Sequence, residues 1–96
     1  METDRLYAIS KVLSDPTRFE ILKRIAADEE VACAVLKETF PVTQATVSHH
    51  LRELQEAGLI EVRRQAKYMH IKLNRAVWRE YIGALTALLP HNPETR

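Results

Sequence analysis

The chain is poor in the residue types on which several classes of functional site depend. It has one cysteine, Cys33, which excludes an intrachain disulfide and a metal site built from several thiolates of one chain. It has two glycines, too few for a glycine-rich loop that cradles a phosphate. Ser48 and His49 are neighbours, but no carboxylate is suitably placed to orient them for nucleophilic catalysis. An enzyme is therefore the weakest of the functional alternatives, and we expect no cofactor.

Long apolar runs and targeting signals are also missing. No stretch approaches the roughly 18 apolar residues of a membrane-spanning helix. The acidic start, Met1–Asp4, differs from the basic and then apolar pattern of a secretory signal. We therefore expect a cytoplasmic protein with no membrane partner. Aromatic residues make up only 6% of the 96 residues, so the core is expected to be aliphatic, and residues 1–96 are expected to form a single domain.

The net charge is only +1, but the charges are unevenly distributed along the chain. Residues 1–42 hold six Lys or Arg against eight Asp or Glu, which gives −2. Residues 43–75 hold six against three, which gives +3, and residues 76–96 hold two of each sign. Because binding to a polyanion depends on the local patch of charge, the low total does not exclude a nucleic-acid partner.

Apolar spacing predicts helices before residue 42. Leu6, Ile9 and Val12 recur at helical spacing and define a first helix. Asp15 is positioned to cap a second helix, with Pro16 in its first position, where no amide partner is lost.

A third helix is expected directly after the acidic run Asp28–Glu30, because negative charge is favourable at a helix N-terminus. Its inward-facing residues would be Val31, Val35 and Leu36. Pro41 ends it, since the residue before a proline avoids the α region.

Residues 43–58 predict one complete helix with an unusual outer face. Thr43 can cap it, and Gly58 stands where a left-handed residue would close it. Val47, Leu51 and Leu54 form an apolar stripe that faces the core, and His50 is expected to pack at its edge. The opposite side carries small and hydrogen-bonding residues that can reach base edges in a major groove: Gln44, Ala45, Thr46, Ser48, His49 and Arg52. Thr43, at the start of the helix, is expected to contact DNA with them. With the third helix, at about residues 31–58, this segment forms a helix-turn-helix.

After Gly58, the inward-facing residues recur at every second position instead of at helical spacing. Residues 59–63 and 68–73 alternate as half-buried strands do, so they predict a hairpin. Its tip, residues 64–67, lacks the glycine that a tight turn favours, which indicates a longer or mobile connection. Arg63, Arg64 and Lys67 would make this hairpin a cationic finger; the alternative is that the charges only discourage edge-to-edge aggregation.

The last predicted helix, at about residues 74–89, begins at Asn74 and is apolar on more than one side. A helix of this kind cannot bury every apolar residue against so small a chain, so it is expected to pair with its copy. The residues expected at this homodimer interface are Leu6, Ile9, Val77, Trp78, Tyr81, Leu85 and Leu88.

The segments 13–22, 43–58 and 59–73 together resemble the ArsR/SmtB family of winged-helix repressors, and residues 44–51 are the most specific part. The resemblance implies a mostly α fold with a small β-hairpin wing at about residues 59–73. It also implies a homodimer joined through its first and last helices, which binds double-stranded DNA as a repressor released by a small effector. Carried over by position, Gln44, Ala45, Ser48 and His49 resemble the base-facing group. The effector is not identified by the sequence.

The metal sites of that family are not matched. Where the family pattern has Cys-Val-Cys, this chain has Ala32-Cys33-Ala34, with alanine at both ligand positions. The four ligand positions of the last helix correspond to Arg75, Val77, Leu88 and His91, of which one could bind. We therefore expect no metal ligand. Two alternatives remain open: a redox-sensing regulator that uses Cys33, and a winged helix that binds another protein through its last helix.

Overall fold

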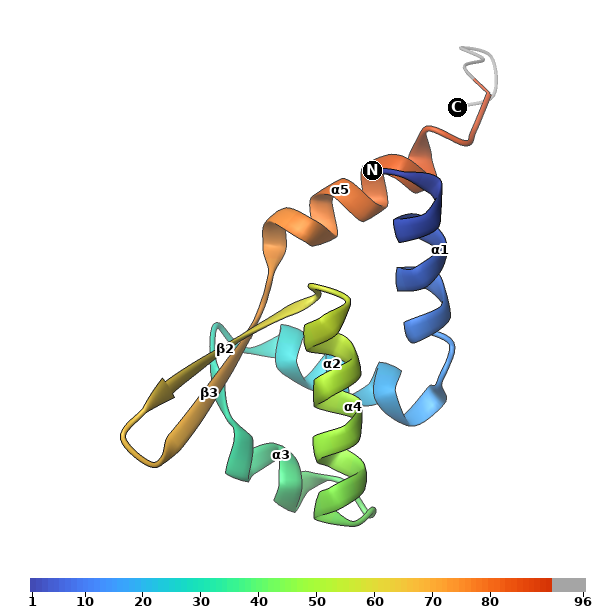
Figure 1. Ribbon diagram of the computed structural model, residues 1–96. Coiled ribbons are helices and arrows are strands. Elements are labelled where there is room, and N and C mark those ends of the chain that lie inside the picture. The colour runs from blue at the N-terminus through green and yellow to red at the C-terminus, as the bar shows by residue number, and fades with distance from the viewer. Residues whose placement is uncertain (91–96) are drawn as a thin grey trace.

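The computed structural model describes residues 1–90, which form a mostly helical protein with one small sheet (Figure 1). The helices are α1 (Thr3–Val12), α2 (Pro16–Ala27), α3 (Cys33–Thr39), α4 (Gln44–Glu56) and α5 (Arg75–Thr86). The strands are β1 (Val31–Ala32), β2 (Ile60–Gln65) and β3 (Tyr68–Leu73). The predicted class, helices with a β-hairpin between the fourth and the last, is confirmed.

Side-chain caps fix where three of the helices begin. Asp15 Oδ1 accepts a hydrogen bond from the Arg18 amide at 2.9 Å, and Pro16 follows it as the first residue of α2. Thr43 Oγ1 accepts from the Thr46 amide at 3.1 Å, and Asn74 Oδ1 accepts from the Val77 amide at 3.3 Å. Each cap satisfies an amide that the helix itself leaves unpaired. The three predicted starts are therefore confirmed.

Gly58 closes α4 in the left-handed region, with φ of +80°. A β-carbon placed there would lie 3.0 Å from Arg5 Nη2 of α1 and 3.8 Å from Val77 of α5. Glycine is therefore needed for its backbone conformation, since the flexible end of Arg5 can move and the Val77 distance is an ordinary contact.

The sheet has the strand order β1–β3–β2, and both pairings are antiparallel. In the register, Val31 pairs with Ile71, and Ile60 pairs with Leu73. The prediction that the third helix starts directly after the acidic run is wrong, because Val31 and Ala32 form strand β1 and the helix begins at Cys33. Val35, expected to face inward, is 39% exposed.

The hairpin turn is shorter than expected. Gln65 pairs directly with Tyr68, so only Ala66 and Lys67 lie between the strands. Ala66 takes up the strain that a glycine would relieve, with φ of +56°. The expectation of a longer connection at this tip is therefore wrong.

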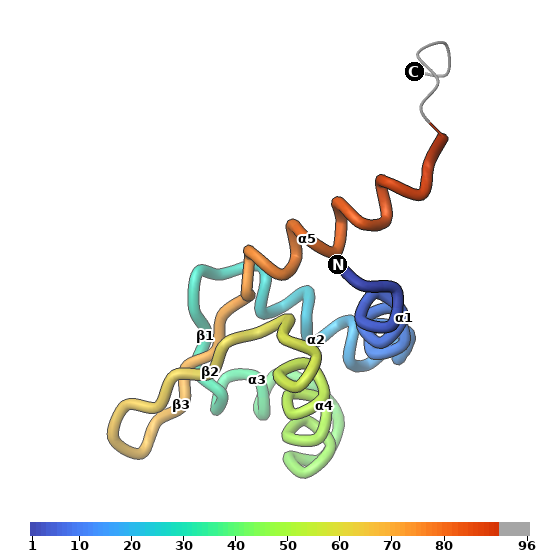
Figure 2. Tube along the Cα trace, turned by 45° about the horizontal axis from the view of Figure 1, so that its top comes forward, coloured from blue at the N-terminus to red at the C-terminus, as the bar shows by residue number. Residues whose placement is uncertain are grey.

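The core lies where α2, α3 and α4 meet the sheet. Its fully buried side chains are aliphatic, as expected: Ile9, Ile21, Ile25, Leu36, Val47, Leu54, Leu59 and Ile71. Helix α5 runs away from this core beside α1 (Figure 2), which gives the molecule extents of 52 × 25 × 24 Å. The start of α4 and the hairpin tip lie at the opposite end from the far end of α5 (Figure 1).

Within the part of the chain that is described, no helix has the length and apolar character needed to cross a bilayer.

Candidate nucleic-acid interface

The outer face of α4 is accessible, as predicted. Gln44, Ala45, His49 and Arg52 are exposed, and Ser48 is half-buried. The opposite face is buried, with Val47, Leu51 and Leu54 in the core. This one-sided burial leaves a row of small and hydrogen-bonding side chains at the surface, which fits close approach to another surface.

Thr43 and Thr46, also predicted to contact DNA, are partly committed to the start of α4. Their hydroxyl oxygens lie 2.9 Å apart and share a hydrogen bond, while Thr43 Oγ1 also accepts from the Thr46 amide. The two side chains thus fix the first turn of α4, and Thr43 stays exposed at its tip.

A hollow of about 310 Å³ separates α4 from the hairpin. The cationic side chains that line it are Lys37 of α3, Arg52 of α4 and Arg64 of β2, and Ser48 lies beside them. Lys37 was not among the predicted residues, because the charge count assigned it to the acidic first part of the chain. The fold brings it beside Arg52 and Arg64, so the cationic side chains at this surface are not limited to the +3 segment.

The hairpin tip extends this positive surface. Lys67 Nζ lies 5.6 Å from the centre of the Tyr68 ring, at the distance of a cation–π contact. Tyr68 is 58% exposed, although aromatic rings are usually buried, and was not predicted as a site residue. A ring held under a lysine at a hairpin tip can contact a sugar or phosphate together with that lysine.

Arg63 is less available than the sequence suggested. Its Nη2 donates to Glu30 Oε1 at 2.8 Å and its Nε to Glu30 Oε2 at 3.3 Å, while its Nη1 donates to Gln65 at 2.9 Å. The hydrogen bond from Arg63 lowers the pKa of Glu30, and the carboxylate raises the pKa of Arg63. His70 Nδ1 lies 3.8 Å from the same carboxylate. Arg63 therefore ties the hairpin to the segment before β1.

The expected dimer face is only partly available. Ile9 is completely buried in its own chain, and Tyr81 is 7% exposed with its hydroxyl 2.7 Å from Ser10 Oγ of α1. These two side chains therefore offer little surface to a partner copy, and the hydrogen bond of Tyr81 links α5 to α1 of the same chain. Leu6, Val77 and Trp78 are half-buried, while Leu85 and Leu88 are exposed. The large apolar side chains that are exposed on these helices, or directly after α5, are Tyr7, Ile82, Leu85, Leu88 and Leu89.

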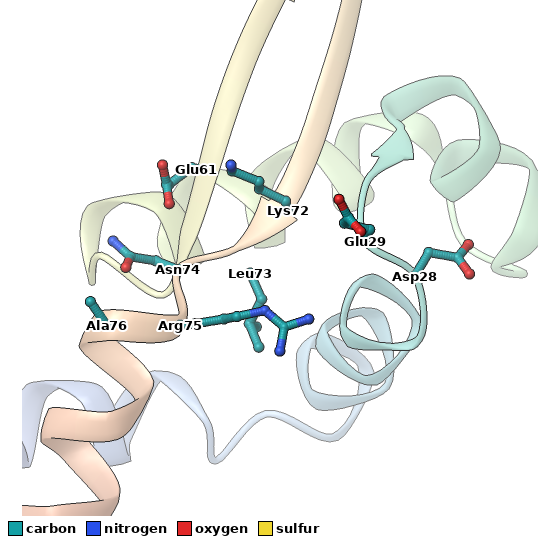
Figure 3. A pocket seen from close by; sticks show the side chains of 8 residues that line it. All are labelled: Asp28, Glu29, Glu61, Lys72, Leu73, Asn74, Arg75 and Ala76. Carbon is teal, nitrogen blue, oxygen red and sulfur yellow. The ribbon is translucent and has the colours of Figure 1, made fainter.

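A hollow of about 480 Å³ lies where β3 passes into α5 (Figure 3). Three carboxylates and two cationic side chains line it, from the end of α2, the hairpin and the start of α5: Asp28, Glu29, Glu61, Lys72 and Arg75. Because side chains of both signs line this hollow, its net charge is too small to select a charged ligand. Asn74, which also lines the hollow, has a structural role there, because its side chain caps α5.

Cys33 is the first residue of α3 and is 8% exposed, packed in the core cluster. This is the environment of a compact apolar residue. Among residues 1–90, no group of three or more His, Cys, Asp or Glu is arranged to hold a metal ion. His91, which matches one family ligand position, lies outside the described residues.

The comparisons with known proteins agree with this geometry. A family model described as a helix-turn-helix domain matches residues 13–63. The chain is 34% identical, over 92 residues, to the arsenical resistance operon repressor of Staphylococcus aureus, covering 96% of this chain and 88% of that protein. An ArsR-like transcriptional regulator from Rhodococcus sp. RHA1 superposes with a TM-score of 0.80, at 25% identity, over 88% of this chain and 79% of that one.

A third similar protein has a homodimeric structure. It is a winged helix-turn-helix DNA-binding domain from Mycobacterium bovis, with a TM-score of 0.71 and 23% identity over 88% of this chain and 79% of that one. Its likeness supports the fold. The helix-turn-helix of α3 and α4, the hairpin wing and the repressor relative together place the chain in the ArsR family of winged helix-turn-helix transcriptional repressors, which are DNA-binding proteins and not enzymes.

Proposed function

We propose that the protein binds double-stranded DNA as a homodimer, with α4 in the major groove and the hairpin along the flanking backbone. The observation that supports this proposal is that the exposed face of α4 and a group of cationic side chains lie next to each other at one end of the molecule. The exposed face of α4 offers hydrogen-bonding groups to base edges, and Lys37, Arg64 and Lys67 beside it offer positive charge to phosphates. Such a regulator acts where the DNA is, in the cytoplasm.

Dimerisation would use the apolar surface at the other end of the molecule, formed by α5 and α1. Ile82 of α5 is more than half exposed, as are Leu88 and Leu89, which come directly after this helix, and Tyr7 of α1 is 65% exposed. Pairing through this surface would place two copies of α4 roughly 34 Å apart, so the operator would be an imperfect palindrome with half-sites about one helical turn apart. Release by a small effector completes the proposed mechanism. The effector's chemistry remains unassigned.

The residues divide into two roles that a selection from random DNA can separate. Ser48→Ala or His49→Ala is expected to relax sequence preference, because each removes a group that faces base edges. Lys67→Ala is expected to weaken binding to all sequences alike and to flatten the dependence of log Kd on log salt by about one unit. Sequencing of bound pools and salt titrations measure both effects. If retained DNA depends neither on salt nor on these residues, the assignment is wrong.

The ion pair between Glu30 and Arg63 offers a variant that should bind more tightly. Glu30→Gln removes one negative charge near the wing and frees Arg63 from its carboxylate partner. We expect DNA affinity to rise by about threefold to tenfold at low salt, with the salt dependence steeper by about one unit. The gain should shrink as salt rises.

Glu38→Gln is the matched control, because Glu38 is an exposed carboxylate on α3 that makes no ion pair with any of residues 1–90. If both variants gain equally, the effect comes from overall charge and not from the release of Arg63.

The competing function is a protein-interaction module that docks a different partner on α5. The exposed leucines on α5 and directly after it are the observation that favours it. Sedimentation of the pure protein distinguishes the two functions, since a stable monomer at micromolar concentration supports the module and contradicts the repressor dimer.

A further inference from the structure

One polar group in the described core has no part in the proposed DNA face. His50 lies on the inner side of α4, next in sequence to the exposed His49, and is only 6% exposed. A buried imidazole needs hydrogen-bond partners, because an unpaired polar group costs free energy away from water. The hydrogen-bond partner of His50 lies on α2, 32 residues earlier in the chain.

The partner is Arg18, whose guanidinium makes two contacts that diverge. Its Nε donates to His50 Nδ1 at 3.2 Å, and its Nη1 donates to the backbone oxygen of Val12 at 3.0 Å. Val12 is the last residue of α1, so its carbonyl has no partner within the helix and lies at the negative end of the helix dipole. One planar side chain thus connects the end of α1, a helix of the proposed dimer interface, to α4.

The contact fixes the protonation state that His50 must have. Nδ1 has to keep its lone pair to accept from Arg18, so the neutral ring carries its proton on Nε2, which lies 3.9 Å from Asp15 Oδ1. A proton added to Nδ1 would turn the acceptor into a donor facing another donor. It would also place a second positive charge beside the guanidinium.

The groups around His50 shift its pKa in opposite directions. Desolvation by burial is the largest influence and lowers its pKa below the usual 6.5, and the charges of Arg18 and His49 lower it further. Asp15, at the start of α2, and Glu53, on α4, raise it, though less than burial lowers it. Lys11 of α1 lines a neighbouring hollow of about 600 Å³ together with Asp15, Arg18 and Glu53. Solvent in this open hollow gives protons a route to the cluster.

We propose that Arg18 is a positioning residue, which holds recognition helix α4 in register with α1 by bridging His50 to the end of α1. Protonation of His50 breaks this bridge and weakens DNA binding below neutral pH. The inference depends on the proposed use of α4 as the recognition helix. A small turn of α4 moves Ser48, His49 and Arg52 together, so loss of the bridge affects all base contacts at once.

The test compares each protein with itself at pH 8 and pH 5, at constant ionic strength, on a duplex selected from random DNA with the wild-type protein at pH 8. Wild type is expected to bind roughly tenfold more weakly at pH 5. His50→Asn keeps an acceptor near the position of Nδ1 but cannot take up a proton, so its two affinities should differ by less than about twofold. Far-UV circular dichroism at both pH values verifies that each protein is folded.

Two further variants keep the test decisive if His50→Asn fails to fold. Asp15→Asn retains an N-cap but removes the negative charge facing His50 Nε2, so the pH at which binding is lost should move down. Arg18→Lys cannot hold both acceptors, and should bind roughly tenfold more weakly than wild type at pH 8.

Three outcomes would overturn the inference while leaving DNA binding intact. They are an unchanged pH ratio in His50→Asn, an unmoved midpoint in Asp15→Asn, and wild-type affinity of Arg18→Lys at pH 8. A wild-type protein that binds the duplex more tightly at pH 5 than at pH 8 also contradicts it. If the wild-type protein retains no duplex at pH 8, the proposed function fails and this inference fails with it.

Discussion

The variant Ile82→Glu/Leu88→Glu is expected to be a monomer and to bind a palindromic duplex about a hundredfold more weakly than wild type, or worse. The Ile82 side chain on α5 is 56% exposed and the Leu88 side chain directly after α5 is 71% exposed, so the substitutions cost little within one chain. At a dimer interface, each would bury an unpaired carboxylate. Without the dimer, the second half-site loses the high effective concentration supplied by the first. Sedimentation and DNA titration measure the two effects.

Ala87→Glu is the matched control for this variant. Ala87 directly follows α5 and is exposed. On a continuation of the helix it would lie about 100° away from Leu88, on the side opposite to Ile82 and Leu85. It should leave both the dimer and DNA binding unchanged. A monomer that still binds the palindrome at wild-type affinity would show that α5 has another role.

The second large effect is expected from Ala45→Glu, because it should separate folding from binding. Ala45 is exposed in the first turn of α4, where a carboxylate is favourable for the helix, so stability should stay the same or rise by about 0.3–1 kcal/mol. The same carboxylate would face base edges and phosphates. We expect DNA affinity to fall by about a hundredfold or more. Urea unfolding and DNA titration give the two values.

Ala45→Gln is the control, since it has nearly the same size without the charge. It should lose much less affinity than the glutamate variant. If Ala45→Glu binds DNA normally, α4 does not enter the groove by this face.

Much of the fold could be predicted because its signals are local. Asp15, Thr43 and Asn74 bind amides three residues away, so their caps depend only on neighbouring sequence. The amphipathic stripe of α4 is also a local signal. For this reason the helix starts and the exposed face of the proposed recognition helix could be predicted.

The features that were missed depend on distant residues. Strand β1 has two residues and exists because Val31 and Ala32 pair with Ile71 and His70, so its own sequence resembles the beginning of a helix. The bridge from Arg18 to His50 joins residues 32 apart. Neither pairing leaves a periodic pattern in the chain.

The α5 helix shows another limit of periodicity. An apolar pattern on several sides indicates that the helix has more than one packing partner, but not which stripe faces which partner. Tyr81 turned out to face α1 of its own chain, whereas Leu88 faces outward. Which stripe of α5 faces α1 is decided by the path that the chain takes after Asn74.

That path is very short, because a single residue, Asn74, separates β3 from α5. The Asn74 amide also donates to the backbone oxygen of Leu59 at 2.9 Å, directly after the turn that ends α4. One extra residue at this joint would rotate the apolar face of α5 by about 100° around its axis. In the proposed dimer, this one-residue linker would set the spacing of the two half-operators, and a change in the length of the hairpin tip would leave that spacing unchanged.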